Sequence, residues 1–227
     1  MGIIIAVLLF SFIIIFHELG HFLLAKKNGI RVDEFSLGLG PTLLGKQIGE
    51  TKFSLKLLPF GGACMMGEDD ADDLSEGSFN SKSVWARMSV VAAGPIFNLI
   101  LACVFCFILI MITGYRSPEI TGVLDGYSAQ EEGLQAGDVI TEINGRNVHI
   151  WDDVSLYTMT HADEAPFKVE YERDGKKYTA KLEPRQLEGD AAPLLGVTSG
   201  DIVKPGIFKS VEYSIYKVKY WMNYTVD

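Results

Sequence analysis

Two long apolar runs dominate the pattern of hydrophobic and polar positions along this chain. The first extends from Ile3 to Ala25 and the second from about Met88 to Thr113. A helix needs about 20 predominantly apolar residues to cross the hydrocarbon core of a bilayer, and both runs reach that length. The pattern therefore predicts two transmembrane helices, at residues 1–25 and 88–113.

A shorter apolar pattern lies in the loop between them, residues 26–87. The segment from Thr51 to Met66 alternates apolar and polar side chains as a β-strand does, and it contains Gly61-Gly62. It is too apolar for an exposed linker. Two interpretations stay open: a hairpin that dips into the membrane beside the first helix, where its edge could pair with an unwound substrate, or a small sheet packed on the helix ends.

The segment after the second run alternates in the manner of a small α+β domain, predicted at residues 119–184. Strands are expected at 120–124, around 139–140, at 167–173 and at 177–182, with turns at Asn144-Gly145 and Asp174-Gly175. A short helix is expected to begin at Asp152 or Asp153, and it should carry these apolar residues on or near its inner face: Val154, Tyr157 and Met159.

A last amphipathic helix is predicted within residues 205–227. Its apolar positions recur at helical spacing, and lysines occupy other positions. The apolar positions are Phe208, Val211, Ile215, Val218 and Met222. Such a helix is typical of a segment at a membrane interface.

The candidate chemistry lies inside the first apolar run, in His17-Glu18-Leu19-Gly20-His21. Positions i and i+4 of a helix share one face, so the imidazoles of His17 and His21 can reach one metal ion. Zinc fits this pair, and Glu18 beside it could act as general base toward a water molecule. A charge at the bilayer centre costs about 2.5 to 3.5 kcal/mol, which disfavours a chance occurrence here. We therefore predict His17 and His21 as zinc ligands and Glu18 as the catalytic residue.

The second apolar run carries two further features. Gly94-Pro95 predicts a kink in the early turns of the helix, and Asn98 follows on the next turn. Asn98 could be a hydrogen-bonding residue between helices, or its side chain could face the metal site or the backbone of a substrate.

Composition agrees with a membrane protein that has a water-soluble part. The 227 residues are 48% hydrophobic, and much of the net charge of −9 comes from acidic residues between Glu68 and Glu76. That acidic run lacks the ligand spacing of a calcium loop and is predicted to be a solvated loop. The three cysteines indicate no disulfide framework, and we expect no nucleic-acid partner.

Basic residues predict the orientation, because Lys and Arg are enriched in cytoplasmic loops. They stand near the helix ends in residues 26–87: Lys26, Lys27, Arg31, Lys82 and Arg87. This loop should be cytoplasmic, and the residues after Thr113 should lie on the other side. His17 would then lie nearer the cytoplasmic face of the bilayer.

These motifs together resemble the site-2 protease family of intramembrane zinc metalloproteases, of the RseP and RasP type. The pattern in residues 126–145, which begins with Gly126-Tyr127-Ser128-Ala129, also resembles a bacterial PDZ domain. The remaining matching motifs are Leu58-Pro59-Phe60-Gly61-Gly62, Met66-Gly67-Glu68-Asp69 and Gly94-Pro95-Ile96-Phe97-Asn98. The implied fold class is membrane α-helical, with a cytoplasmic reentrant β element around Gly61 and one extracytoplasmic α+β PDZ-like domain.

The resemblance also implies an activity and its partners. The expected activity is zinc-dependent regulated intramembrane proteolysis of single-span membrane proteins, such as anti-sigma factors and remnant signal peptides, in the plasma membrane of a bacterium. The PDZ-like domain would filter or bind substrate. By the same resemblance Gly61, Gly62 and Asn98 would contact the substrate.

One departure from the family pattern concerns the third zinc ligand. The family uses an Asp in a Leu-Asp-Gly motif on a later transmembrane helix, and we reject Leu124-Asp125-Gly126 because it ends a strand of the outer domain. We expect the chain to be an N-terminal fragment. The alternatives are a catalytically incompetent, membrane-tethered PDZ protein that binds peptides, and a metalloprotease that acts on soluble peptides.

Overall fold

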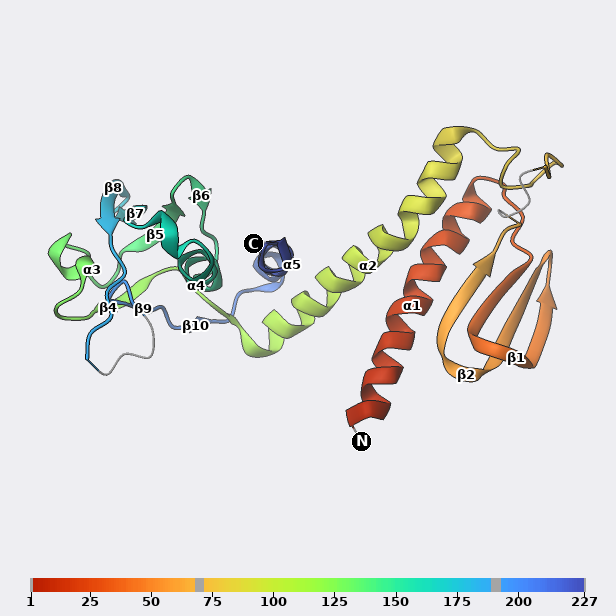
Figure 1. The fold of residues 1–227 in the computed structure, drawn as a ribbon, viewed down its shortest axis with the longest axis horizontal. Coiled ribbons are helices and arrows are strands. Elements are labelled where there is room, and N and C mark those ends of the chain that lie inside the picture. Colours follow the sequence, from red (N-terminus) through yellow and green to blue (C-terminus); the bar gives the residue numbers. More distant parts are fainter. Residues whose placement is uncertain (1, 68–71, 189–192, 227) are drawn as a thin grey trace. The chain divides into compact units, whose positions relative to one another are not determined.

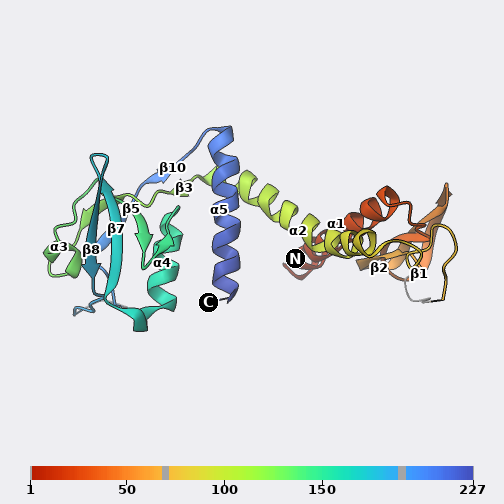
Figure 2. The ribbon, with the colours of Figure 1, turned by 90° about the horizontal axis from the view of Figure 1, so that it is seen from above.

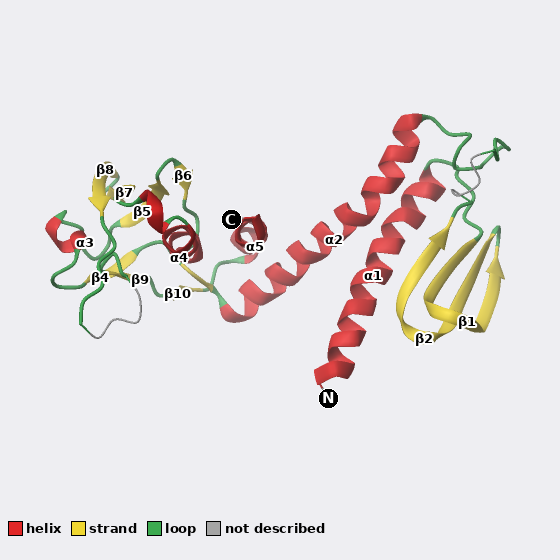
Figure 3. Ribbon diagram, viewed as in Figure 1, coloured by secondary structure: helices red, strands yellow, loops and turns green. Residues whose placement is uncertain are grey.

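The computed structural model describes residues 2–67, 72–188 and 193–226, and the chain divides into two compact units (Figures 1 and 3). The first unit comprises Met1–Ala102 and the second Cys103–Asp227. Helix α2 contributes residues to both. Met1, Asp227 and the first part of the predicted acidic run, Glu68 to Asp70, lie outside the described residues.

The two apolar runs form helices α1 (Gly2–Lys27) and α2 (Val84–Thr113). Helix α2 begins at Val84 rather than at the predicted Met88, because the Ser83 hydroxyl accepts a hydrogen bond from the Ala86 N–H (3.3 Å) and caps the helix. Both helices are long and apolar enough to cross a membrane, and most of their apolar side chains are exposed. A water-soluble protein would bury such surfaces, so the helices indicate membrane association.

Helices α1 and α2 pack antiparallel within the first unit (Figure 1). A Cβ atom on Gly20 would lie 2.6 Å from the Ala93 carbonyl oxygen, so only glycine permits this approach. Phe16 and Phe97 pack beside the crossing, with ring centroids 5.8 Å apart. Small residues at a helix crossing are typical of packing in membranes.

Strands β1 (Glu34–Ile48) and β2 (Thr51–Met65) form a hairpin whose two arms bend back on themselves. Residues 42–48 pair with 51–56, and residues 34–37 pair with both 52–55 and 62–65. The bent end of β2 lies along the middle of α1, where the Ser11 hydroxyl donates to the Pro59 carbonyl oxygen (2.7 Å). The bent end of the hairpin therefore packs beside α1, and its insertion into a membrane stays a prediction.

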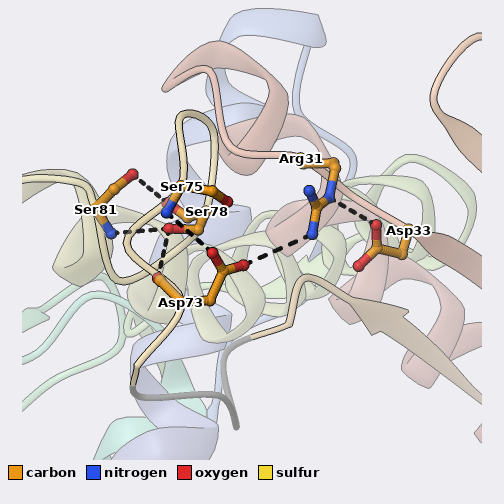
Figure 4. A network of polar contacts seen from close by, with 6 residues as sticks. All are labelled: Arg31, Asp33, Asp73, Ser75, Ser78 and Ser81. Atoms are coloured by element: carbon orange, nitrogen blue, oxygen red, sulfur yellow. Dashed lines mark hydrogen bonds and ion pairs between the residues drawn. The ribbon is translucent and has the colours of Figure 1, made fainter.

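A small core and a polar loop hold the hairpin at the end of α1. Phe35, Val32 and Cys64 are buried there with Ala25 and Val90. The following loop is tied down by an Arg31 guanidinium that lies 2.9 Å from Asp33 and 3.7 Å from Asp73. Asp73 accepts hydrogen bonds from the Ser75 backbone N–H and the Ser78 hydroxyl, and the Ser81 hydroxyl donates to the Ser78 carbonyl oxygen (Figure 4). These hydrogen bonds lie outside the apolar helices.

The second unit contains a four-stranded sheet in the order β6-β5-β7-β8. It also contains two small two-stranded sheets, β10-β3 and β4-β9. Its elements are β3 (Tyr115–Arg116), β4 (Ile120–Val123), α3 (Ser128–Glu131), β5 (Val139–Ile143), β6 (Arg146–Asn147), α4 (Trp151–Thr160), η1 (Ala162–Glu164), β7 (Phe167–Arg173), β8 (Lys176–Leu182), β9 (Val197–Ser199), β10 (Ile202–Val203) and α5 (Ile207–Val226). The predicted turns at Asn144-Gly145 and Asp174-Gly175 have the positive φ angles that such hairpins need.

This unit differs from the sequence prediction in two details. Strand β4 pairs with β9, so the unit extends past residue 184, the predicted end of the domain. Val154 and Tyr157 of α4 are buried as expected, but Met159 is 77% exposed, so its predicted inward position is wrong. Met159 lies five residues after Val154, about 140° around the helix from it, and its side chain is on the solvent side of α4.

Helix α5 follows the prediction in extent, and of its five predicted apolar positions Val218 is buried and the other four are exposed. It packs on α4, where Lys217 donates to Asp152 (2.7 Å), and the stripe Ser210, Ser214 and Val218 is buried (Figure 2). The predicted apolar positions Phe208, Val211, Ile215 and Met222 are instead exposed.

Candidate metal centre

The imidazoles of His17 and His21 border one small space above Gly94 of α2. A Cβ atom built on Gly94 would lie 2.5 Å from Nε2 of His17 and 2.5 Å from Nε2 of His21. The ring centroids are 4.8 Å apart, and the ring planes are nearly perpendicular, at 79°. Only a glycine at position 94 leaves both imidazoles room to pack this closely on α2.

The other ring nitrogens contact α2 on either side of Gly94. Nδ1 of His21 lies 2.7 Å from the Val90 carbonyl oxygen, and Nδ1 of His17 lies 3.2 Å from Nδ2 of Asn98. Val90, Gly94 and Asn98 follow one another at intervals of four residues, so they share one face of α2. Val90 and Asn98 on this face contact Nδ1 of the two rings, and Nε2 of each ring lies next to Gly94.

Glu18 is held by the hairpin rather than by α2. Its Oε2 accepts a hydrogen bond from the Cys64 backbone N–H (3.0 Å), and a Cβ atom on Gly62 would lie 3.6 Å from Glu18 Cγ. Gly61, with φ +83°, turns its backbone toward Leu39 of β1. The two glycines that the sequence indicated therefore lie on the strand that borders Glu18, and Gly62 is in contact range of it.

The donor set fits zinc in part. Neutral imidazole nitrogens are good zinc ligands, and a hydrogen bond from Nδ1–H to a carbonyl is the usual support for a ligating histidine. Catalytic zinc sites normally have three protein ligands, however, and the described residues contain no cluster of three or more His, Cys, Asp or Glu side chains. Asp125, which the sequence analysis rejected, follows β4 in the second unit, where its carboxylate accepts from Gln130 Nε2 (2.6 Å).

Comparison with known proteins assigns the chain to a family. Residues 5–226 match peptidase family M50. The chain belongs to peptidase family M50. This confirms the resemblance to site-2 proteases that the motifs indicated.

Curated relatives of this M50 chain are bacterial proteins that carry the name of a zinc metalloprotease. One from Clostridium acetobutylicum is 38% identical over 212 residues, which cover 93% of this chain and 62% of the relative. One from Clostridium perfringens is 36% identical, with 93% and 63% covered. The zinc metalloprotease RasP of Bacillus licheniformis is 28% identical, with 91% and 69% covered. The chain thus spans about three-fifths of the length of the first two relatives.

Two solved PDZ domains match part of the M50 chain. The PDZ domain of an SdrC-like protein from Listeria monocytogenes is 24% identical, with a TM-score of 0.31, and the alignment covers 37% of this chain and 88% of that domain. The HtrA3 PDZ domain, solved with a phage-derived ligand, is 21% identical with a TM-score of 0.25, and the alignment covers 39% and 88%. Both TM-scores are low, and these two similarities carry no argument about the fold.

Sequence reasoning missed three supports of this M50 site: the Val90 carbonyl, the space at Gly94 and the Cys64 N–H. The two on α2 had a usable signal, because Val90, Gly94 and Asn98 are spaced by four residues opposite a histidine pair with the same spacing. The Cys64 contact had none, because a backbone N–H is present at almost every position and only the fold selects one.

Proposed function

We propose that the complete protein is a zinc-dependent endopeptidase that cleaves membrane-spanning proteins within the bilayer. The observation that carries this proposal is the packing of both Nε2 atoms against Gly94, with Glu18 in the same helical turn of an exposed apolar helix. A water-facing protease would have no reason to place its ionisable groups there, since each is costly in a membrane.

Each residue then has a role that follows from its position. His17 and His21 hold zinc through Nε2, and zinc supplies Lewis-acid activation of water and of the peptide carbonyl. Glu18 takes a proton from the attacking water and returns it to the leaving amine. The hydrogen bond from the Cys64 N–H holds one carboxylate oxygen in place and leaves the other free for this exchange. A third ligand, expected to be an aspartate, would come from beyond residue 227.

The hairpin is proposed to position the substrate. Residues 62–65 form an edge of the bent sheet beside α1, and the Cys64 N–H points to Glu18 rather than to β1. An extended substrate segment could add to this edge by backbone hydrogen bonds and bring its scissile peptide next to Glu18. Gly61 and Gly62 suit such a place because a peptide backbone can approach a glycine closely. Substrates with an unwound segment would be preferred.

The second unit is proposed to bind peptide in a groove between α4 and β9. The groove has a volume of about 400 Å³ and is mostly apolar, with Trp151, Val154 and Met159 on one wall and Leu195 and Val197 on the other. In the described residues β9 pairs only with β4, so its second edge borders the groove. A groove between a strand edge and a helix is where PDZ domains add a peptide strand.

We also propose that the protein crosses the plasma membrane of a bacterium several times, with the hairpin on the cytoplasmic side. The bent end of the hairpin near Ser11 carries exposed apolar side chains, and the opposite end carries Glu50 beside Lys26. A hairpin with one apolar end and one charged end suits insertion of the apolar end into the bilayer, with Glu50 and Lys26 at the cytoplasmic surface. Single-span proteins such as anti-sigma factors and remnant signal peptides are the expected substrates in regulated intramembrane proteolysis.

A second candidate function is a membrane-tethered peptide-binding protein without catalysis. It is favoured by the presence of only two candidate zinc ligands in the described part of the chain. Such a protein would use the groove between α4 and β9 and would not need zinc.

Cleavage by the complete protein in proteoliposomes separates these functions. The substrate is a single-span peptide, and a soluble peptide with the same cleavable sequence is run in parallel. We expect zinc-dependent cleavage of the spanning peptide only, and its loss in Glu18→Gln. The matched control is Glu50→Gln, whose glutamate is 74% exposed, and it should cleave normally.

The outcomes of this experiment are distinct. Normal cleavage by Glu18→Gln would remove Glu18 from the mechanism. Equal cleavage of the soluble peptide would favour a protease whose site is open to water. Peptide binding with no cleavage by the wild type would favour the tethered binding protein.

A further inference from the structure

The Asn98 amide contacts His17 through its nitrogen, while its oxygen is buried without a hydrogen-bond partner in the described structure. As oriented, the amide places Nδ2, a donor, 3.2 Å from Nδ1 of His17. Nδ1 would then have to accept, so the ring proton would sit on Nε2, the nitrogen that faces the space above Gly94. At the same time Oδ1 of Asn98 is buried and has no hydrogen-bond partner in the described structure. A buried acceptor without a donor is costly.

A half-turn of the amide exchanges these two atoms. Oxygen and nitrogen of an asparagine amide have nearly the same shape, and their assignment follows from the hydrogen-bond network. With Oδ1 toward His17, Nδ1 carries the proton and donates to it, and the lone pair of Nε2 faces the space above Gly94. The oxygen then gains a donor, and Nδ2 takes the buried position that Oδ1 leaves.

His21 supplies an independent indication of the same arrangement. Its Nδ1 lies 2.7 Å from the Val90 carbonyl, which can only accept, so the His21 proton must be on Nδ1 and the lone pair on Nε2. Two histidines that share a cation must both offer Nε2 lone pairs. Val90 and Asn98, four residues on either side of Gly94, would then present equivalent acceptors to the two rings.

We propose that Asn98 is a positioning residue whose amide oxygen accepts from Nδ1–H of His17 and keeps Nε2 of that ring free for zinc. The inference rests on the proposed function, since it gives the site its metal. It differs from the expectation that Asn98 contacts the substrate, because the unpaired end of its amide is buried. Asn98 acts through His17 and does not itself touch the reacting atoms.

Nitrogen NMR of the wild-type protein tests the tautomer directly. The complete protein is labelled with ¹⁵N-histidine, kept metal-free at a pH at which the imidazoles are neutral, and compared with His17→Gln to assign the ring. We expect the protonated nitrogen of His17 to be Nδ1. A ring protonated mainly at Nε2 would overturn the inference, whether or not any variant folds.

Two substitutions at Asn98 test the acceptor role. Asn98→Leu keeps the approximate size but removes the acceptor, and we expect it to weaken zinc binding about 10- to 100-fold, as is common when a ligand's hydrogen-bonding partner is lost. Asn98→Asp keeps an acceptor oxygen without the amide donor, and zinc affinity should stay within a few-fold of the wild type. Ser89→Ala, on the same helix and bonded to Asn28 rather than to a histidine, is the matched control.

Zinc affinity is measured by competition with a chromophoric chelator, so no activity is needed. Equal losses in the Leu and Asp variants would show that Asn98 donates and would overturn the inference. Unchanged affinity in Asn98→Leu would do the same. Absence of zinc binding by the wild type would instead contradict the proposed function. If the wild type binds zinc and its cleavage depends on Glu18, the proposed function stands whatever the Asn98 variants show.

Discussion

At the scale of single residues, the site depends on an absent side chain as much as on the groups that are present. The spacing in His17-Glu18-Leu19-Gly20-His21 predicts that two imidazoles share a face, and the structure brings both Nε2 atoms to one space. The residue that makes this space is Gly94 on the other helix. Zinc ligation by His17 and His21 stays a prediction, and what the fold supplies is the close packing of both imidazoles on Gly94.

Gly94→Ala should therefore remove zinc binding without unfolding the protein. The new Cβ would lie 2.5 Å from both Nε2 atoms, so the rings must move apart or turn away from each other. Alanine is a better helix former than glycine by roughly 1 kcal/mol, so α2 itself should not be weakened. We expect zinc affinity to fall at least tenfold with helix content by circular dichroism unchanged.

Gly206→Ala is the matched control for that change, because no atom lies within 4 Å of its Cβ position. It should bind zinc as the wild type does. Retention of full zinc affinity by Gly94→Ala would contradict a site at this place.

At the same scale, the sequence identified residues better than it identified contacts. His17, Glu18 and His21 could be named because a short motif states their chemistry, and Asn98 because a polar side chain is rare in an apolar run. Their partners could not be named, since the Val90 carbonyl and the Cys64 N–H belong to the backbone and are selected only when α1, α2 and β2 are in place.

At the scale of elements, apolar periodicity predicted where helices and strands lie but not always which face is buried. Helix α5 is the clearest case. Its apolar stripe predicted contact with a surface, whereas Ser210 and Ser214 of the next face pack within the second unit. The Ser210 hydroxyl contacts Met111 of α2, and the exposed Phe208, Val211 and Ile215 are left for another apolar environment, such as a membrane interface. Hydrophobic spacing alone cannot distinguish these two faces.

The contact between α5 and α4 should weaken as the pH falls. His149 stacks on Tyr216 of α5, with ring centroids 3.8 Å apart, and burial lowers the pKa of the imidazole. Lys219 also lowers this pKa, while Asp153 and Glu212 oppose the shift. The folded state therefore binds the proton less tightly than the unfolded state. The stabilisation is fully present above about pH 6.5, the ordinary pKa of histidine, and is lost as the pH falls toward the folded-state pKa.

NMR titration of the His149 ring measures this shift. We expect a midpoint below about 6.5 in the wild type, and a midpoint closer to that value in Tyr216→Ala, which uncovers the ring. Tyr224→Ala removes a tyrosine whose ring packs on Tyr220 and Trp221 of the same helix, and it should leave the midpoint unchanged. A wild-type midpoint at or above the ordinary value would refute the burial of a neutral His149.

At the scale of the whole molecule, the chain combines a helical unit that exposes apolar surface with a unit that buries its own core. The composition of the two apolar runs predicted this division, and the turn signals at Asn144-Gly145 and Asp174-Gly175 predicted the hairpins of the second unit. The prediction ended the domain too early, because β9 is only three residues long and carries no alternating pattern strong enough to be recognised. Its pairing with β4 is a long-range contact that local sequence does not specify.

The orientation in the membrane gives the last prediction. If α2 crosses the bilayer once, residues before Val84 and after Thr113 lie on opposite sides, and the lysines near α1 place the hairpin in the cytoplasm. Single cysteines are introduced by Glu50→Cys, at the hairpin turn, and by Lys177→Cys, on exposed β8. An impermeant thiol reagent applied to intact spheroplasts should label Lys177→Cys, and it should label Glu50→Cys only after lysis. The unsubstituted protein gives the background labelling of the three native cysteines. Labelling of both positions from one side would mean that α2 does not cross the bilayer, and it would contradict an intramembrane site. Reversed labelling would keep the crossing and would place the hairpin and Glu18 nearer the outer face.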